Sequence, residues 1–257
     1  MSGGSAVWGA SLAAVFVASA IPLLATWFLA NRPALTAQLV PRLIMIAAGA
    51  LLGAAAFHLI PESLARVSSG HVWLLTGAGV AALALLERVI HAMEHPAAGV
   101  SVTPHETLGH RSHLMPLGIV SDALHNTIDG ALVATAFMTN PSLGVFAGAA
   151  IALHELPREL GTFALCVDGG MTPRRAILIN AATGVLALLG AVIALAIGFD
   201  ARRFGELLLP FAAGNFIYLA GAILVAQRRE SRTGSLAMRI ALVLAGVAMT
   251  AMLQGQH

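Results

Sequence analysis

SDALHNTIDGALVATAF, at residues 121–137, is one of two stretches that decide the fold of this chain; the other is AAIALHELPRELGTFAL, at residues 149–165. Each stretch contains a polar motif, HNTID at 125–129 and HELPRE at 154–159. The apolar residues around each motif form a segment long enough to cross the ~30 Å hydrocarbon layer of a bilayer as a helix. Ionisable side chains are costly in hydrocarbon and usually face a pathway or one another there. The two stretches therefore predict neighbouring transmembrane helices that share a polar site.

The composition of the whole chain supports a membrane protein. Of its 257 residues 58% are hydrophobic and 10% are charged, and the mean hydropathy is +0.85. A soluble domain carries about 25% charged residues. Ala, Leu and Gly dominate, which is typical of closely packed membrane helices, whereas a β-barrel would show short alternating segments. We predict an all-α membrane protein with a single polytopic membrane domain over residues 1–257.

Apolar runs and their polar breaks divide the chain into transmembrane segments. They predict eight helices, at about 7–30, 37–60, 72–93, 115–138, 143–167, 174–199, 206–227 and 235–254. The first run is too long for the apolar region of a signal peptide, so we interpret it as a span. The outer triplets of helices would have opposite topologies around a central pair. This 3+2+3 arrangement with inverted triplets is common among secondary transporters.

The fourteen arginines indicate the orientation. With the N-terminus outside, most of them fall in cytoplasmic loops, in agreement with the positive-inside rule. Both termini would then face outside, and the one long loop, 94–114, would lie between the third and fourth helices in the cytoplasm. Its imidazoles, and those on its approach, either hold metal loosely or are incidental in a solvated loop. They are His91, His95, His105, His110 and His113.

The predicted helix at 115–138 carries a stripe of polar residues. His125 and Asp129 are four residues apart, so they lie one turn apart on one helix face. Asn126 flanks the same face, and Asp122 extends the stripe toward the cytoplasm. An imidazole and a carboxylate in this relation can bind one metal ion.

The predicted helix at 143–167 supplies a second polar group. His154 and Glu155 point roughly 100° apart around the helix axis, and Glu159 repeats the direction of Glu155. Pro157 lies between them and favours a kink. This nitrogen and oxygen set suits Zn²⁺ and tolerates Fe²⁺, Mn²⁺ or Cd²⁺. The candidate metal ligands are His125, Asn126, Asp129, His154, Glu155 and Glu159; a buried polar network that fixes helix packing is the alternative.

Two further polar features lie on other predicted helices. His58 and Glu62 are four residues apart near the outer end of the second helix, with Pro61 between them. They form either a gate or external access site, or a pair at the membrane interface whose side chains satisfy each other's hydrogen bonds. Asn180 on the sixth helix either supplies an amide to the metal site or makes an interhelical hydrogen bond, and we favour the bond.

The motif HNxxDG followed by HExPxE resembles the ZIP (Zrt/Irt-like) family of divalent metal transporters, its LIV-1 and bacterial branches most of all. The stretches GALLGAAAFHLIPES at 49–63 and GNFIYLAGA at 214–222 resemble that family as well. The resemblance implies eight helices, outside termini and metal movement into the cytoplasm between helices 2, 4, 5 and 7. It also implies that His125, Asn126, Asp129, His154 and Glu155 are ligands.

The chain departs from the family pattern at Arg158, where the family often has a histidine or another ligand. A guanidinium cannot ligate a cation. Because Arg158 follows His154 by four residues, it points at the same site. We expect its fixed charge to replace a second metal ion, which favours a single-metal centre. Some carboxylates common along the family's path are also missing, such as the one after Gly161, where Thr162 stands.

These features favour a divalent metal transporter, with zinc uptake into the cytoplasm by alternating access as the leading hypothesis. The sequence has no GxxxxGK[ST] motif for nucleotide binding, and we expect no prosthetic group and no enzymatic activity. One alternative is a membrane metal-binding regulator that does not transport. Another is an intramembrane metallohydrolase, because HELPRE begins like HExxH, although Arg158 stands in place of the second histidine.

We expect a divalent metal ion and the lipid bilayer as partners and no nucleic acid, because the arginines lie in loops beside spans. The sequence leaves a monomer and a homodimer open. The short chain, its compact loops and the absence of a targeting peptide favour a bacterial inner membrane.

Overall fold

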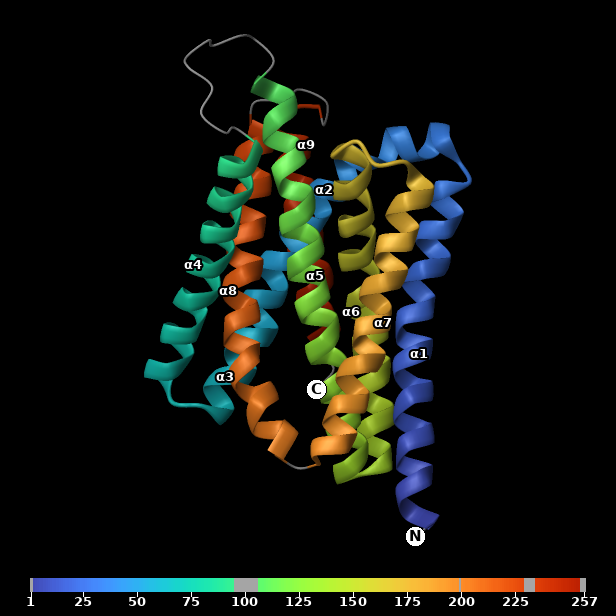
Figure 1. The fold of residues 1–257 in the computed structure, drawn as a ribbon. Helices are drawn as coiled ribbons and strands as arrows, with labels where there is room; N and C mark the ends of the chain where they lie inside the picture. The colour runs from blue at the N-terminus through green and yellow to red at the C-terminus, as the bar shows by residue number, and fades with distance from the viewer. Residues whose placement is uncertain (1, 95–105, 199, 229–233, 255–257) are drawn as a thin grey trace.

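The computed structural model describes residues 2–94, 106–198, 200–228 and 234–254 (Figure 1). Every regular element in these ranges is a helix, which confirms the all-α fold. The elements are α1 (Ser2–Ala30), α2 (Pro33–Ala54), the π-helix η1 (Ala55–Leu59), α3 (Ile60–Arg66), α4 (Ser69–Glu94), α5 (Glu106–Thr139), α6 (Pro141–Asp168), α7 (Pro173–Ile197), α8 (Asp200–Arg228) and α9 (Leu236–Gln254). Because α2, η1 and α3 follow one another without a break, the elements correspond one to one with the predicted helices.

The largest difference from the predicted boundaries is at the start of α5. It begins at Glu106 rather than near residue 115, so part of the expected loop 94–114 is helical. Its polar first turns have no apolar run to mark them, and a helix can continue past the bilayer. His91 is exposed on α4, and His110 and His113 fall within the residue range of α5. His95 and His105 lie outside the described residues, and metal handling by this segment stays a prediction.

Helix length and hydropathy support a chain that crosses the membrane several times. Five described helical segments are long and apolar enough to span it: Gly4–Ala30, Pro33–Arg66, Ser69–Met93, Pro173–Ile197 and Leu207–Arg228. The apolar part of α9, Leu236–Met252, is shorter. The helices α5 and α6 are absent from these five although they are long. They carry the ionisable motifs, and such residues lower the mean hydropathy of a helix.

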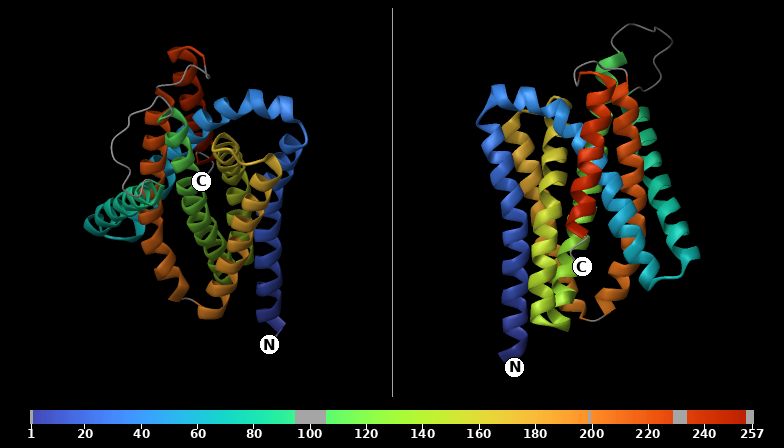
Figure 2. Two further views of the ribbon diagram at one scale, coloured as in Figure 1. Left: turned by 45° about the horizontal axis from the view of Figure 1, so that its top comes forward. Right: turned by 180° about the vertical axis from the view of Figure 1, so that it is seen from behind.

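The helices form two packed groups. One contains α1, α5, α6 and α7, and the other contains α2, α4, α8 and α9. Figure 1 shows α4 and α8 along one side and α1 and α7 along the other, with α5 between them. From behind, α9 lies along α2 (Figure 2). The contacts of α2 with α6 and of α5 with α8 join the two groups. The helices α5 and α6, which carry the polar motifs, therefore lie at the seam, the interface between the two groups.

The helix partners follow the pattern that inverted triplets require. The helix α2 packs on α9 as α8 packs on α4, and α1 packs on α6 as α7 packs on α5. The contact of α2 with α6 likewise has a counterpart in that of α8 with α5. When the first three spans are exchanged in order with the last three, and α5 with α6, each of these helix contacts becomes its counterpart. This correspondence supports the 3+2+3 arrangement.

Close packing of α5 on α7 fixes the position of the polar stripe on α5. Gly130 of α5 faces the carbonyl of Ala187, and Gly190 of α7 faces the carbonyl of Thr127. At both positions a Cβ atom would overlap the backbone of the other helix. Small residues of this kind let membrane helices approach at backbone distance. Gly130 therefore allows α5 to lie close to α7 at the level of its neighbour Asp129.

We expect Gly130→Val to lower the free energy of unfolding by about 1–3 kcal/mol, because the added side chain must push α7 away. Thermal unfolding of the detergent-solubilised protein measures this. Gly221→Val is the matched control, since Gly221 is exposed on α8 and its Cβ would meet no atom within 4 Å. Equal unfolding temperatures for the two variants would contradict the proposed role of Gly130 in packing.

Candidate metal centre

Four side chains from α5 and α6 converge at the seam of the molecule. They are His125, Asp129, His154 and Glu155, and one ligand atom from each lies within 4.8 Å of the others. The closest approach is 3.0 Å, between His154 Nε2 and Asp129 Oδ2. Ligands around one tetrahedral Zn²⁺ lie roughly 3–3.5 Å apart, given metal–ligand distances of about 2.0–2.2 Å. This four-residue cluster therefore has the size and the chemistry of a site for one divalent cation.

Helix periodicity explains how the cluster forms. His125 Nε2 lies 3.3 Å from Asp129 Oδ2, one turn away on the same face of α5. On α6, the step of about 100° between successive residues separates His154 from Glu155. The His154 side chain is 18% exposed, toward a cavity, whereas Glu155 is buried, and their nearest atoms, Nε2 and Oε1, are 3.8 Å apart.

The imidazole of His125 is as deeply buried as the carboxylate of Glu155, each residue being 2% exposed. Neither of its ring nitrogens has a hydrogen-bond partner among the described residues, although Nε2 is close to Asp129. Its ring packs against Phe216 of α8, with centroids 4.6 Å apart, and against His154, with centroids 5.7 Å apart. A buried nitrogen without a hydrogen bond is costly. Ligation of a metal ion would satisfy it.

Phe216 was not predicted as a site residue. It belongs to the stretch GNFIYLAGA, whose resemblance to a known family is the signal that the sequence carries there. Its role in holding the His125 ring depends on the packing of α8 on α5, which helix spacing alone does not give.

A second cluster surrounds Arg158, next to the first. The guanidinium forms ion pairs with Asp122 of α5 and Glu155 of α6, and its Nη2 atom lies 3.9 Å from Glu159 Oε1. Arg158 Nε also donates to Glu155 Oε1 at 3.1 Å. The Thr162 hydroxyl donates to Asp122 at 3.3 Å. Arg158 and its three carboxylate partners are buried, so one fixed cation faces three carboxylates away from water.

Two of the predicted ligands belong to this second cluster. The Asn126 amide donates to Glu159 Oε1 at 3.1 Å and to Asp122 Oδ2 at 3.3 Å. The structure thus brings four of the six candidate ligands together, and places Asn126 and Glu159 around the arginine. Glu155 joins the clusters, because its Oε1 faces both His154 and Arg158.

Asn180 makes the interhelical bond that we favoured. Its amide donates to the backbone carbonyl of Glu159 at 2.9 Å, which ties α7 to α6 two residues after Pro157.

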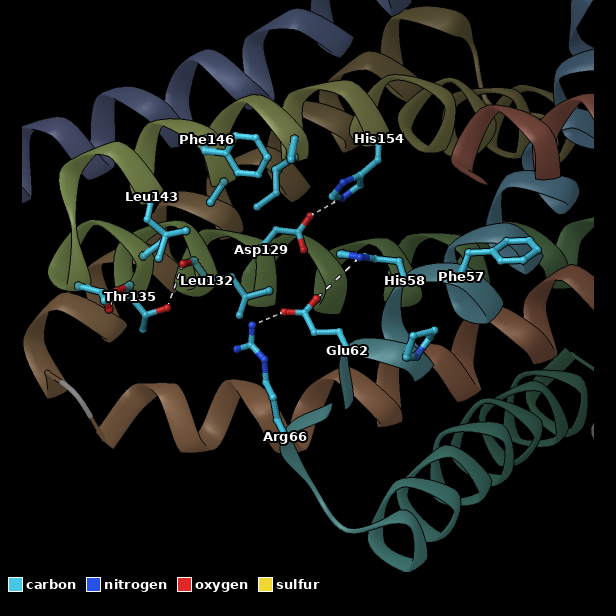
Figure 3. Close-up of a pocket in the computed structure, with 16 residues that line it drawn as sticks. Phe57, His58, Glu62, Arg66, Asp129, Leu132, Thr135, Leu143, Phe146 and His154 are labelled. Atoms are coloured by element: carbon cyan, nitrogen blue, oxygen red, sulfur yellow. Dashed lines mark hydrogen bonds and ion pairs between the residues drawn. The ribbon is translucent and has the colours of Figure 1, made fainter. Parts of the chain in front are cut away.

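A cavity of about 570 Å³ leads to the four-residue cluster from the predicted outer side. Asp129 and His154 line its inner end, and His58, Glu62 and Arg66 line the wall formed by η1 and α3 (Figure 3). His58 Nδ1 lies 3.7 Å from Glu62 Oε2. The ring of His58 lies 5.8 Å from that of His154, between centroids. The predicted access pair is therefore adjacent to the cluster.

The fold and this site together define a helical, multi-pass membrane protein with a buried imidazole and carboxylate centre suited to a divalent cation. The family model for "ZIP Zinc transporter" matches residues 108–254. The chain belongs to the ZIP zinc transporter family.

Curated relatives agree with this assignment. Zinc transporter YKE4 of Saccharomyces cerevisiae is 30% identical over 230 residues, which cover 77% of this chain and 62% of the relative. Zinc transporter zipt-7.1 of Caenorhabditis briggsae is 27% identical over 282 residues, covering 88% of this chain and 71% of the relative. Zinc transporter ZIP6 of Homo sapiens is 39% identical over 102 residues, which cover 40% of this chain and 14% of the relative.

The chain thus spans less than two thirds of the yeast relative's length. The matches to ZIP6 and to the Drosophila melanogaster transporter foi support the LIV-1 branch of the resemblance. The family and these relatives are zinc transporters and not enzymes, in agreement with the expectation for this chain.

Proposed function

We propose that this chain carries a divalent metal ion, Zn²⁺ above all, across the membrane and into the cytoplasm through the four-residue cluster. The observation that carries the proposal is the convergence of two imidazoles and two carboxylates within 4.8 Å at the inner end of a cavity. Two nitrogen and two oxygen donors suit Zn²⁺, and the same set tolerates Cd²⁺, Fe²⁺ or Mn²⁺. The names of the relatives favour zinc.

The proposed route begins at His58 and Glu62, continues to His154 and Asp129, and reaches His125 and Glu155 deeper in the molecule. Beyond the cluster, on the predicted cytoplasmic side, Arg158 and Asp122 line a space of only about 10 Å³. A path that is wide on one side and closed on the other supports alternating access. Release would require the group of α1, α5, α6 and α7 to move against the group of α2, α4, α8 and α9.

We also propose that the centre holds one metal ion. Asn126 and Glu159, which would be needed around a second ion, are engaged with each other and lie at the Arg158 cluster. The guanidinium supplies a fixed positive charge where a second ion would otherwise balance Asp122, Glu155 and Glu159. From the distribution of arginines, we propose that both termini lie outside. The compact loops favour a bacterial inner membrane.

Reconstitution into liposomes tests this function. We expect saturable influx of Zn²⁺ above that of empty liposomes, with Cd²⁺, Fe²⁺ and Mn²⁺ compared under the same conditions. Zinc that binds to the purified chain but does not cross the liposome membrane would favour the regulator hypothesis. Binding and influx together would distinguish the transporter from both alternatives.

A further inference from the structure

The π-helix η1 determines which residues of the second span face the cavity. Its five residues replace one α-helical turn, and the Ile60 amide donates to the carbonyl of Ala55 rather than to that of Ala56. A π-turn inserts one residue into the helical repeat and rotates everything that follows, and such turns are frequent at functional sites. His58, Glu62 and Arg66 all line the cavity (Figure 3).

Within this cavity wall, Glu62 holds a cationic side chain on one of its oxygens. Arg66 Nη2 lies 2.7 Å from Glu62 Oε1, while His58 Nδ1 lies 3.7 Å from Glu62 Oε2. Glu62 and Asp129 are the carboxylates among the residues that line the cavity. A metal ion that enters from the outer side thus meets a carboxylate that already has a guanidinium bound to it.

We propose that Arg66 is a tethered competitor for the entering metal ion, which must displace its guanidinium from Glu62 before it can pass to His154 and Asp129. This inference rests on the proposed function and adds a control on its first step. A divalent ion coordinates a carboxylate oxygen directly, at about 2.0–2.2 Å, and carries twice the charge of a guanidinium. A monovalent ion has no such advantage.

The exposure of the pair makes the exchange feasible. The Arg66 side chain is 34% exposed and that of Glu62 is 23% exposed, so water reaches both. Ion pairs of this kind are weak and open readily, because solvent stabilises the separated charges. The displaced guanidinium remains on its flexible stem and returns once the metal has moved inward. Arg66 therefore raises the metal concentration needed for occupancy without blocking the route.

Zinc influx into liposomes tests the role of Arg66 through the separation of apparent KM from maximal rate. We expect Arg66→Gln to lower the apparent KM for Zn²⁺ about three- to fivefold, as removal of a competing ion pair of this strength allows. The maximal rate should change little. Glu62→Gln should raise the apparent KM. Arg88→Gln is the control, because Arg88 is exposed on α4 and does not line the cavity.

A double-mutant cycle shows whether Arg66 acts through Glu62. We expect Glu62→Gln combined with Arg66→Gln to have the apparent KM of Glu62→Gln alone. If Arg66→Gln lowers the apparent KM equally in both backgrounds, the arginine acts by general repulsion in the cavity and the competitor mechanism is wrong. An unchanged or higher apparent KM in the single variant would also overturn it.

Zinc binding to the detergent-solubilised protein separates failure of this inference from failure of the proposed function. Absence of influx in the parent protein contradicts transport, but Arg66→Gln should still tighten the binding of Zn²⁺ at Glu62, measured in an Asp129→Asn background that weakens the four-residue cluster. Unchanged affinity in that variant overturns the role of Arg66. Thermal unfolding verifies that the variant folds, and Arg66→Met, which keeps much of the aliphatic stem, replaces it if it does not.

Discussion

Asp129→Asn is expected to lower the ratio of maximal rate to apparent KM for Zn²⁺ influx by about 100-fold or more. Removing one charged partner from a buried set typically costs 2–5 kcal/mol, and 1.4 kcal/mol corresponds to a factor of ten. Asp129 has this weight because its Oδ2 atom is the shared neighbour of His154, at 3.0 Å, and His125, at 3.3 Å. Asparagine keeps the shape of the side chain and removes the negative charge that a cation requires.

Influx into liposomes measures this loss, and zinc binding in detergent should weaken in parallel. Asp168→Asn provides the same chemical change at the end of α6, away from the cluster and the cavity, and should leave influx within a factor of two of the parent. If Asp129→Asn retained a third or more of the parent's influx ratio, the ion would have to take a route that avoids the cluster.

Arg158→Met is expected to lower the free energy of unfolding by about 3–5 kcal/mol, the usual cost of breaking a buried charge pair from one side. The substitution leaves Asp122, Glu155 and Glu159 buried together with no cation between them. Thermal unfolding of the solubilised protein measures the loss. Arg88→Met, at an exposed position of α4, is the control for removal of one positive charge.

Arg158→His tests the same position from the other side, because imidazole can ligate a metal and guanidinium cannot. We expect bound zinc to rise from one ion to two per chain, as measured by metal analysis after dialysis. Excess zinc should also raise the unfolding temperature of this variant more than that of the parent, since a ligand stabilises the state that binds it. Two zinc ions bound by the parent protein would contradict the single-metal centre.

Much of the fold could be predicted from the sequence, because each span leaves an apolar run bounded by polar residues. Spacing along one helix was equally informative about the site: His125 with Asp129, and His58 with Glu62, lie together as the interval of four residues requires. These are local relations, fixed by the geometry of a single helix.

Relations between helices were harder to predict. Asn126 and Glu159 have the chemistry of ligands, yet they lie with Arg158, because the depth at which α6 crosses α5 decides which side chains meet. Phe216 depends in the same way on the packing of α8. Arg66 follows Glu62 by four residues, and the two side chains lie 2.7 Å apart, as that interval allows. Its place on the wall of a cavity depends on the helices that pack around it, which the interval does not give.

The division of the helices into two groups has a mechanical consequence for the cargo. All four residues of the cluster come from α5 and α6, which belong to the same group, whereas His58, Glu62 and Arg66 lie on the span that packs with the other. A shear between the groups would leave the coordination shell of the ion intact, and the ion would move together with α5 and α6. The ion would lose contact with the residues that admitted it, and would need no exchange of ligands midway through the membrane.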